Sequence, residues 1–257
     1  MHFKLVSIIT PSYNSELFIS DAINSVINQT YKNWELIVVD DASKDNTCTI
    51  VNDYIVNDNR IHLIRLTQNS GAGVARNKAI KYAKGAYIAF LDADDVWKPH
   101  KLEMQLEFMK KYKLSFTYSS YEQINEKGDS LNKLINALPV LSYNKLLKCN
   151  YVGNLTVIYS VTLLGKIYMP KIRKRQDWVL WVRVIEKSGQ TKGIQESLAY
   201  YRIRKDSMSA NKFNLLKYNY NFYRKGLNFA PLKSVIYLIR FLIEYFFIKS
   251  KQTTTLQ

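Results

Sequence analysis

Residues 87–95 read Tyr-Ile-Ala-Phe-Leu-Asp-Ala-Asp-Asp, a short apolar run that ends in a group of carboxylates. Aromatic and β-branched residues followed by polar ones are typical of a buried strand. Open α/β sheets bind their ligands just beyond the carboxyl ends of their strands. The segment therefore predicts a strand from Tyr87 to Leu91, with Asp92, Asp94 and Asp95 at the edge of the sheet where such folds bind ligands.

The residues before Tyr87 alternate between β-rich runs and helical patterns. The runs expected to form strands are Leu5–Thr10, Glu35–Asp40 and Ile61–Leu66. Amphipathic patterns between the strands predict helices at Leu17–Gln29, Asn46–Asn57 and Val74–Lys84. Ser43 is the expected N-cap of the second helix. Strand, helix, strand at this spacing predicts a parallel sheet with helices on its faces.

The pattern after Lys98 is less regular. Helices are expected at His100–Tyr112, Tyr143–Lys148 and Asp177–Lys187, and strands at Ser115–Ser119, Thr156–Ser160 and Leu198–Ile203. A polar turn is expected at Asn125–Asp129, after the first of these strands. The basic tail, residues 212–251, is rich in Tyr and Phe, and its last part predicts one amphipathic helix.

The composition is that of a globular protein. The chain has 257 residues, 47% of them hydrophobic, with nine Gly and five Pro, which excludes collagen-like and low-complexity chains. Cys48 and Cys149 lie far apart in the sequence, so neither a disulfide scaffold nor a zinc site is predicted. The first residues lack a signal-peptide pattern, and no apolar run reaches the roughly 18 to 20 residues that span a bilayer. We therefore expect a cytoplasmic protein.

The positive charge is concentrated in the last third of the chain. The whole chain has a formal net charge of +16, but residues 1–162 account for only +2 of it and residues 163–257 for +14. A charge of this size predicts an anionic partner, which is either nucleic acid or the surface of an anionic membrane.

The acidic loop from Asp92 to Asp95 has two interpretations that weigh about equally on their own. Neighbouring carboxylates repel one another and persist most easily around a divalent cation, and their hard oxygen atoms suit Mg²⁺ or Mn²⁺ held together with a substrate phosphate. The alternative is a turn that caps the helix expected at His100, because Asp is also favoured there.

Two other loops at the same edge of the predicted sheet carry polar residues. Asp40 and Asp41 follow the second strand; one of them could bind a base or a ribose, with Tyr13 stacking nearby, but taken singly an Asx turn and helix cap is favoured. The loop before the third helix, Ser70–Asn77, carries Arg76 where a dinucleotide fingerprint has a Gly. Arg76 suits either a diphosphate or an ion pair with the acidic loops.

Asp177 lies at the start of a helix whose other residues are largely aromatic and apolar. A carboxylate at a helix start beside a hydrophobic wall is suited to general base catalysis. The alternative is that Asp177 is an N-cap and that its Trp neighbours belong to the core.

These segments, taken in order, resemble the family 2 glycosyltransferases of the GT-A (nucleotide-diphospho-sugar transferase) fold. The resemblance runs from Val6 to about Lys212. It rests on Ser7–Asn14, Trp34–Ser43, Gly73–Asn77, Asp92–Asp95, Asp177–Arg183, and Tyr201–Arg204 with Ser207 and Ser209.

The resemblance implies a role for each matching residue. Pro11, Tyr13 and Asp41 would form the nucleobase site, Arg76 would lie near the donor, and Asp92 would face the ribose or the donor sugar. Asp94 would bind Mn²⁺ or Mg²⁺, and Asp177 would be the base that deprotonates the acceptor hydroxyl. The implied reaction is a metal-dependent, inverting displacement of UDP.

The sequence departs from the family pattern at three positions. Gln176 replaces the usual Glu before the base, and Val179 replaces a frequent Asp. Arg204 stands where many relatives have His; it cannot bind a cation but could pair with the diphosphate. The QxxRW signature of processive synthases is absent, which indicates that one sugar is added per encounter.

The resulting hypothesis is an inverting hexosyltransferase. Residues 1–210 would form the catalytic domain, with a nucleotide-sugar half (1–112) and an acceptor half (113–210), and residues 211–257 would form a tail that binds the anionic inner membrane. The donor would be UDP-glucose or UDP-galactose and the acceptor a lipid-diphosphate-linked sugar (GlcNAc-PP-undecaprenol), as in O-antigen and lipopolysaccharide synthesis. The alternatives are a nucleotidyltransferase of similar fold and a basic nucleic-acid-binding protein, although no specific nucleic acid partner is expected.

Overall fold

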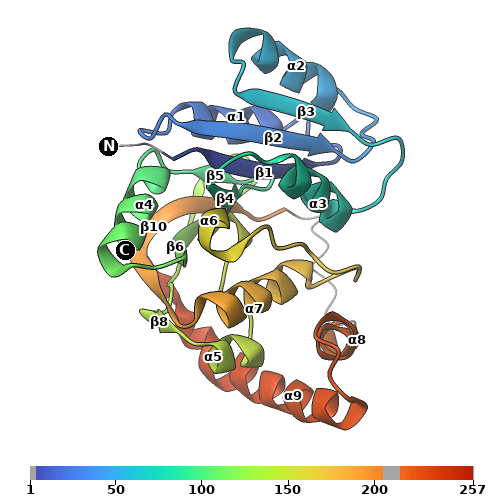
Figure 1. Cartoon of the computed structure of the whole chain (residues 1–257), viewed down its shortest axis with the longest axis vertical. Coiled ribbons are helices and arrows are strands. Elements are labelled where there is room, and N and C mark those ends of the chain that lie inside the picture. The colour runs from blue at the N-terminus through green and yellow to red at the C-terminus, as the bar shows by residue number, and fades with distance from the viewer. Residues whose placement is uncertain (1–3, 205–214, 257) are drawn as a thin grey trace.

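Four parallel strands, which we name the central strands because helices cover both of their faces, form one end of the sheet (Figure 1). The structure, a computed structural model, describes residues 4–204 and 215–256. The central strands stand in the order β3-β2-β1-β4 and are all parallel. Their bounds are Val6–Ser12 (β1), Trp34–Asp40 (β2), Ile61–Arg65 (β3) and Tyr87–Phe90 (β4). The predicted strands are thus confirmed, with ends that differ by one or two residues.

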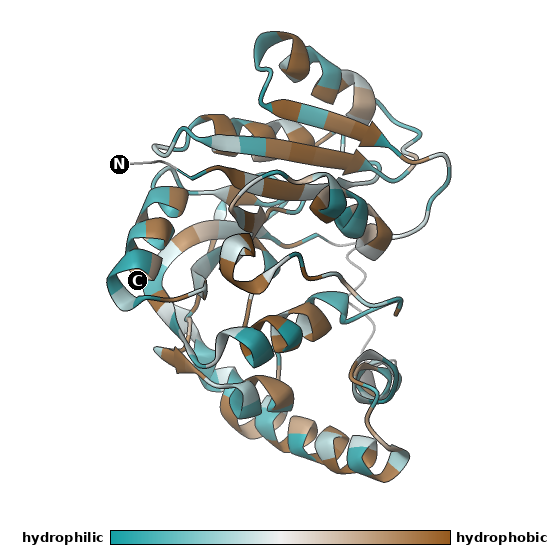
Figure 2. Ribbon diagram, in the orientation of Figure 1, coloured by the Kyte–Doolittle hydropathy of each residue, from teal (hydrophilic) through white to brown (hydrophobic). Residues whose placement is uncertain are grey.

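Helices cover both faces of these strands, which explains why β1 and β2 are buried along their whole length. Helices α1 (Ile19–Ile27) and α2 (Thr47–Asn57) share one hydrophobic core with Ile8 and Val38. Helix α3 (Ala72–Tyr82) packs on the opposite face with Ile9 and Val39. Figure 2 shows the hydrophobic residues concentrated along the central strands.

The expected parallel pairing is confirmed for the central strands, whereas the sheet beyond β4 is largely antiparallel. Strand β9 pairs antiparallel with β4 and β6, β7 with β6, and β11 with β7, whereas β10 runs parallel to β6. The short strands β5 and β8 pair antiparallel with β10. A short turn such as the one between β6 and β7 can only join antiparallel neighbours. The bounds are Val96–Trp97 (β5), Phe116–Ile124 (β6), Ser130–Ile135 (β7), Val140–Leu141 (β8), Ile158–Ser160 (β9), Thr191–Arg202 (β10) and Thr253–Thr255 (β11).

Helix α7 (Gln176–Ser188) is buried in the same hydrophobic core as Ile9 and Val39. Its Trp178 and Trp181 are fully buried, and the ring of Trp181 meets the ring of Phe90 edge to face, 5.1 Å between centroids. The remaining helices before the tail are Lys101–Tyr112 (α4), Tyr143–Lys148 (α5) and Val161–Leu164 (α6), with a 3₁₀ turn at Asn154–Thr156.

The tail packs against the rest of the chain. It contains α8 (Leu215–Asn221), α9 (Pro231–Ile243), β11 and three further helical turns at Phe222–Gly226, Glu244–Ile248 and Lys249–Gln252. Helix α9 and the turn after it form the last part of the tail, for which the sequence predicted one amphipathic helix. The ring of Phe222 stacks on Trp178 with 3.7 Å between centroids, and Phe241 is buried in the same core. In Figure 1, α9 lies at the opposite end of the molecule from α2 and β3. Within residues 4–204 and 215–256, no helix has the length and apolar character needed to cross a bilayer.

The expected N-cap of α2 is wrong. The Ser43 hydroxyl donates to Oδ1 of Asp40 over 2.5 Å and accepts from the backbone N–H of Asn14. The first turn of α2 instead begins at Thr47, whose backbone N–H donates to Oδ1 of Asp45 over 3.0 Å. Ser43 therefore ties the loop after β1 to the loop after β2.

Candidate functional site

The acidic loop after β4 is held by basic and amide side chains. Oδ1 of Asp92 accepts hydrogen bonds from Nη2 of Arg76 over 2.6 Å and from Nδ2 of Asn154 over 3.1 Å. Oδ2 of Asp94 pairs with Nη1 of Arg204 over 3.3 Å. The alternative that this loop caps the following helix is wrong, because α4 begins at Lys101 and its N-cap residue makes no side-chain cap.

The carboxylates of this loop are crowded and largely out of water. Burial raises the pKa of Asp94, and the Asp92 charge raises it further, although Arg204 acts in the opposite direction. Asp95 is buried, and its Oδ1 accepts the backbone N–H of Arg202 over 3.0 Å. Burial together with Asp94 and Asp92 raises its pKa well above the usual value. Negative charge is therefore concentrated at the carboxyl end of β4.

Arg76 balances part of this negative charge. Its side chain is mostly buried, and burial alone would lower the pKa of the guanidinium. The charges of Asp92, Asp177 and Asp94 outweigh that effect and leave the pKa raised. Of the two roles that the sequence left open for Arg76, the ion pair with the acidic loop is observed.

Asp41 fixes the loop that precedes α3. Its two carboxylate oxygens accept the backbone N–H groups of Ser70 and Gly71, each over 2.7 Å. Gly71 has φ +90°, a left-handed conformation that favours glycine. Asp41 thus positions the start of the helix that carries Arg76.

The other two residues of the expected nucleobase site stand at the end of β1. Pro11 is buried within the strand, whereas the Tyr13 side chain is 45% exposed. The backbone N–H of Asp41 donates to the carbonyl of Ser12 over 2.8 Å, so the ends of β1 and β2 are held side by side. Tyr13 therefore has an accessible ring beside the loop that contains Asp41.

Asp177 lies in the first turn of α7, but it does not cap the helix, because Arg175 is the N-cap residue. Its Oδ2 accepts a hydrogen bond from Nδ2 of Asn150 over 3.1 Å. Its Oδ1 accepts no hydrogen bond within the part of the chain that the structure describes. A carboxylate held through one oxygen has the other free to take a proton.

Helices α3 and α7 approach each other closely beside the site. A Cβ atom at Gly73 would overlap the carboxamide of Gln176, the residue that stands where Glu is usual. Gly73 thus leaves room for the Gln176 side chain in its observed position. Arg76 of α3 and Asp177 of α7 line the same cavity.

A cavity of about 390 Å³ brings the acidic loop and Asp177 together. Arg76, Asp92 and Asp177, three of the predicted site residues, line it. The predicted pair Asp94 and Arg204 lies beside it, next to Asp95 in its wall. Pro11, Tyr13 and Asp41 are not part of its lining; they belong to the ends of β1 and β2.

The sequence did not predict several polar residues of this cavity, which are Asn150, Asn154, Arg175, Lys249 and Gln252. Arg175 carried a local signal, because it directly precedes the helix of Asp177. Asn150 and Asn154 lie in an irregular segment, and Lys249 and Gln252 lie in the tail, so nothing in their neighbourhood pointed to the site.

The donor atoms at the carboxyl end of β4 fit a hard divalent cation. Within residues 4–204 and 215–256, no three His, Cys, Asp or Glu side chains are clustered as a complete metal site. One or two carboxylates are what Mg²⁺ or Mn²⁺ requires when substrate phosphates supply further oxygen ligands. Burial and then repulsion from Asp92 raise the pKa of Asp94, and a bound cation would relieve that repulsion.

The arrangement combines a carboxylate base with a region suited to an anionic, cation-bound leaving group. Asp177 lines the same cavity as the ion pair of Asp92 and Arg76. Such a pair of functions suits transfer of a group from a diphosphate to a hydroxyl.

Comparison with known proteins places these features in one family. The family model described as "Glycosyl transferase family 2" matches residues 7–169. TuaG of Bacillus subtilis (strain 168), a putative teichuronic acid biosynthesis glycosyltransferase, is 44% identical over 221 residues, covering 86% of this chain and 88% of TuaG.

Two relatives from Escherichia coli have names that state a donor and an acceptor. Both WfgD and WfaP are named UDP-Glc:alpha-D-GlcNAc-diphosphoundecaprenol beta-1,3-glucosyltransferase. WfgD is 42% identical over 241 residues, covering 93% of this chain and 92% of its own. WfaP is 39% identical over 213 residues and covers 83% of each chain.

Solved structures share the fold. Residues 1–349 of TarS of S. aureus, in complex with UDP-GlcNAc, match with a TM-score of 0.73 and 23% identity, covering 94% of this chain and 73% of that one. The mannosyltransferase PcManGT of Pyrobaculum calidifontis, in complex with GDP-Man and Mn²⁺, matches with a TM-score of 0.64 and 16% identity, covering 98% and 72%. These likenesses show the GT-A fold.

Proposed function

The chain belongs to glycosyltransferase family 2, and from this premise we propose that it transfers a hexose from a UDP-sugar to a lipid-diphosphate-linked sugar. The observation that carries the proposal is the similarity to WfgD along nearly the whole of both chains. The names of WfgD and WfaP support glucose as the sugar, with galactose as the other candidate, and GlcNAc-PP-undecaprenol as the acceptor. The reaction would then belong to O-antigen or lipopolysaccharide synthesis.

Family membership weighs against the two alternative functions. Nucleotidyl transfer shares the requirement for a cation, but it gives no role to a base at Asp177. Nucleic-acid binding would need the basic last third alone, whereas the family model matches residues 7–169. Glycosyl transfer uses both the acidic loop and Asp177.

In the proposed mechanism Asp177 is the general base. The acceptor hydroxyl gives its proton to Asp177, its oxygen bonds to the anomeric carbon, and the bond from that carbon to the UDP oxygen breaks. Because attack and departure occur on opposite faces, an α-linked donor yields a β-linked product. The hydrogen bond from Nδ2 of Asn150 to Oδ2 of Asp177 supports this role by orienting the carboxylate.

The donor side would be formed by the residues at the carboxyl ends of the central strands. Pro11, Tyr13 and Asp41 are the proposed nucleobase contacts, and the exposure of the Tyr13 ring supports a stacking role. Asp92 would face the ribose or donor sugar. The guanidinium groups of Arg76 and Arg204 would bind diphosphate oxygens.

Asp94 is the proposed protein ligand of Mn²⁺ or Mg²⁺. The ion supplies charge neutralisation of the leaving diphosphate when it is bound. Arg204, 3.3 Å from Asp94, stands where it can add positive charge on the same side.

The surface of α9 supports a peripheral place on the cytoplasmic face of the inner membrane. Large apolar residues are exposed along this helix and the turn after it: Leu232, Val235, Ile236, Ile239, Ile243, Phe246, Phe247 and Ile248. We name this set the apolar ridge. Figure 2 shows hydrophobic residues recurring along α9. A helix of this kind on a basic segment is typical of proteins that lie on anionic bilayers.

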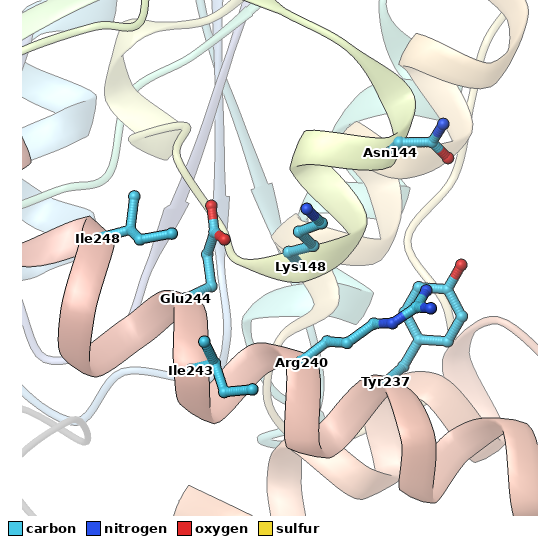
Figure 3. Close-up of a pocket in the computed structure, with 7 residues that line it drawn as sticks. All are labelled: Asn144, Lys148, Tyr237, Arg240, Ile243, Glu244 and Ile248. Atoms are coloured by element: carbon cyan, nitrogen blue, oxygen red, sulfur yellow. The ribbon is translucent and has the colours of Figure 1, made fainter.

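Positively charged side chains line a cleft beside the apolar ridge. Figure 3 shows Lys148 of α5 and Arg240 of α9 among the residues that line it, with the ring of Tyr237 beside Arg240. Glu244, also in the lining, is already paired with Lys145. Lys148 and Arg240 make no ion pair with the described residues. They therefore suit lipid phosphates next to the apolar contact.

A transfer assay tests the proposed function. Purified protein is incubated with UDP-glucose or UDP-galactose, Mn²⁺ and a GlcNAc-diphospho-lipid, and the products are analysed by mass spectrometry and NMR. We expect one added hexose in β linkage. Absence of transfer to any lipid-diphosphate sugar with either donor would contradict the proposal.

A further inference from the structure

The C-terminal segment forms part of the wall of the catalytic cavity. Lys249 and Gln252 line the same cavity of about 390 Å³ as Asp92 and Asp177. Strand β11, which comes directly after Gln252, pairs antiparallel with β7 at the edge of the sheet. Residues from the end of the chain are thus held beside the proposed base.

Reciprocal hydrogen bonds fix this segment. Nε2 of Gln252 donates to the carbonyl oxygens of Asn136 over 2.8 Å and Tyr151 over 3.1 Å. The backbone N–H and the side-chain amide of Asn136 both donate to the carbonyl of Gln252. Because β11 is paired with β7 and the side chain of Gln252 is hydrogen-bonded, the segment holds Lys249 in a defined position.

Lys249 is connected to the proposed base through one residue. Its Nζ donates to the carbonyl of Asn150 over 2.6 Å, and Nδ2 of Asn150 donates to Oδ2 of Asp177. An ammonium has three N–H groups, so two remain for a ligand. Burial lowers the pKa of Lys249, and the nearby Arg175 also lowers it, whereas Cys149 and Asp177 raise it.

Arg175 supplies a second cation to the same wall. Its Nε donates to Oδ1 of Asn219 over 3.0 Å, and its backbone has φ +65°, a strained conformation for a residue with a side chain. No carboxylate of the described residues lies within ion-pair distance of Arg175 or Lys249. Two neighbouring cations in a partly enclosed cavity are destabilising until an anion binds between them.

We propose that Arg175 and Lys249 form a subsite for the diphosphate of the acceptor. The proposal deepens the proposed function and rests on it. The cavity is lined by Asp92, which the proposed function assigns to the cation-bound donor, and by Arg175 and Lys249, the latter connected to Asp177 through Asn150. An acceptor whose hydroxyl reaches Asp177 carries its diphosphate at the other end of the same sugar ring. Charge-assisted hydrogen bonds from lysine and arginine would then recognise its phosphate oxygens.

The test compares two acceptors that differ only in charge. One is GlcNAc-diphospho-alkyl, and the other is the uncharged alkyl glycoside of the same sugar. Lys249→Met should raise the KM for the diphosphate acceptor by about ten- to a hundredfold, since a hydrogen bond to a charged group contributes about 1.5–3 kcal/mol. The KM for the UDP-sugar should stay within about twofold of that of the original enzyme, a change below about 0.5 kcal/mol. Any loss with the uncharged acceptor should be much smaller than the loss with the diphosphate acceptor, because the uncharged acceptor has no phosphate oxygen for Lys249 to bind.

Three further variants separate recognition from structure. Arg175→Gln should show the same selective loss, and Lys249→Arg should recover most of the affinity because it keeps the charge. Lys251→Met is the matched control, because Lys251 lies two residues away in the same turn and is exposed. It should leave both acceptors unaffected.

Each of the other possible results contradicts the proposed subsite. Equal losses on both acceptors would mean that Lys249 only holds Asn150 and Asp177 in place, and no loss would mean that the diphosphate binds elsewhere. In both cases the unaltered enzyme still transfers sugar, so the proposed function stands. If the unaltered enzyme transfers sugar to neither acceptor, the proposed function and the subsite are both wrong.

Discussion

Asp177 is held by Asn150 through one carboxylate oxygen, while its other oxygen accepts no hydrogen bond from the described residues. At the scale of single residues, the chemistry open to each carboxylate depends on which of its oxygen atoms already accept hydrogen bonds. Both oxygens of Asp41 bind backbone N–H groups, and Oδ1 of Asp92 binds Arg76 and Asn154. Asp92 is also ion-paired with Arg76, whereas Asp177 makes no ion pair with a described residue, which supports Asp177 as the proposed base.

Replacing Asp177 tests the base. Asp177→Asn keeps the shape of the side chain but cannot accept the acceptor proton, so kcat should fall by about 10²- to 10⁴-fold. Binding of UDP, measured by calorimetry, should not change. Glu186→Gln, an exposed change on the same helix, is the control and should retain activity. Full activity of Asp177→Asn would exclude Asp177 as the base.

Replacing Asp94 tests the metal site. Asp94→Asn removes the charge but keeps the size, so stimulation of transfer by Mn²⁺ should be lost and the affinity of Mn²⁺ in the presence of UDP should fall by about tenfold or more. The thermal midpoint should not decrease, because the variant relieves the repulsion with Asp92. Asp129→Asn in the exposed turn after β6 serves as the control. Unchanged Mn²⁺ binding in Asp94→Asn would place the ion elsewhere.

At the scale of single elements, the turn after α9 connects the tail to the cavity wall. Oε1 of Glu244 accepts a hydrogen bond from the hydroxyl of Tyr151 over 2.6 Å and pairs with Nζ of Lys145. Tyr151 lines the catalytic cavity, and Glu244 lines the cleft of Figure 3. This carboxylate therefore separates the two sites and holds α9 against α5.

The Glu244 contact predicts a pH-dependent contribution to stability. Burial alone would raise the pKa of Glu244, but Lys145 and Tyr151 lower it below its usual value of 4.5. A depressed pKa stabilises the fold above the unfolded value, and this stabilisation is lost as the pH falls through the folded value. Glu244→Gln should lower the free energy of unfolding by about 1–3 kcal/mol at pH 7.

Denaturant unfolding at several pH values measures this effect. The difference between the original chain and Glu244→Gln should shrink as the pH is lowered below about 4.5. Glu196→Gln, at an exposed position of β10, should show no such difference. A difference that is the same at every pH would mean that the Glu244 charge does not contribute.

At the scale of the whole molecule, the tail serves both the cavity and the surface. Phe222 and Phe241 lie in the core, and Lys249 lies in the cavity wall, while the apolar ridge faces outward. Deleting the tail would therefore remove core and site residues together with the surface. Only substitutions on the exposed face can separate membrane binding from folding.

The double variant Phe246→Ser/Phe247→Ser tests membrane binding. These side chains are 62% and 72% exposed, and burying each in a bilayer would contribute about 1.5–3 kcal/mol. Co-sedimentation with vesicles of phosphatidylglycerol and phosphatidylcholine should weaken by about tenfold or more. Leu163→Ser, on the 69% exposed Leu163 of α6, is the matched control.

The charge of the cleft should add to this binding. The double variant Lys148→Gln/Arg240→Gln should also weaken binding to these vesicles, by about 1 kcal/mol for each cation removed. Added salt should reduce the difference between this variant and the original chain. Transfer to a short-chain, water-soluble acceptor should be unaffected in both double variants. Vesicle binding that is unchanged in all of them would contradict a membrane role for α9.

The sequence by itself determined the central strands, their order of appearance and the polar residues at their carboxyl ends. It could do so because strand and helix periods are local and parallel strands bring their carboxyl ends to one edge. That is why the sequence predicts Arg76 and Asp92 at this edge, whereas Asp177 is predicted from its place at a helix start and from the family resemblance; all three line one cavity. The division of the catalytic domain into a nucleotide-sugar half (1–112) and an acceptor half (113–210) remains a prediction.

Only the tertiary structure decided which distant residues complete the site. The pairing of Thr253 with Ile135 brings the end of the chain to the far edge of the sheet, and Lys249 thereby reaches Asn150. A three-residue strand and a lysine in a basic tail carry no periodic signal. Their positions follow from long-range backbone pairing and from core packing around Trp178, which depend on the folded arrangement of the whole chain.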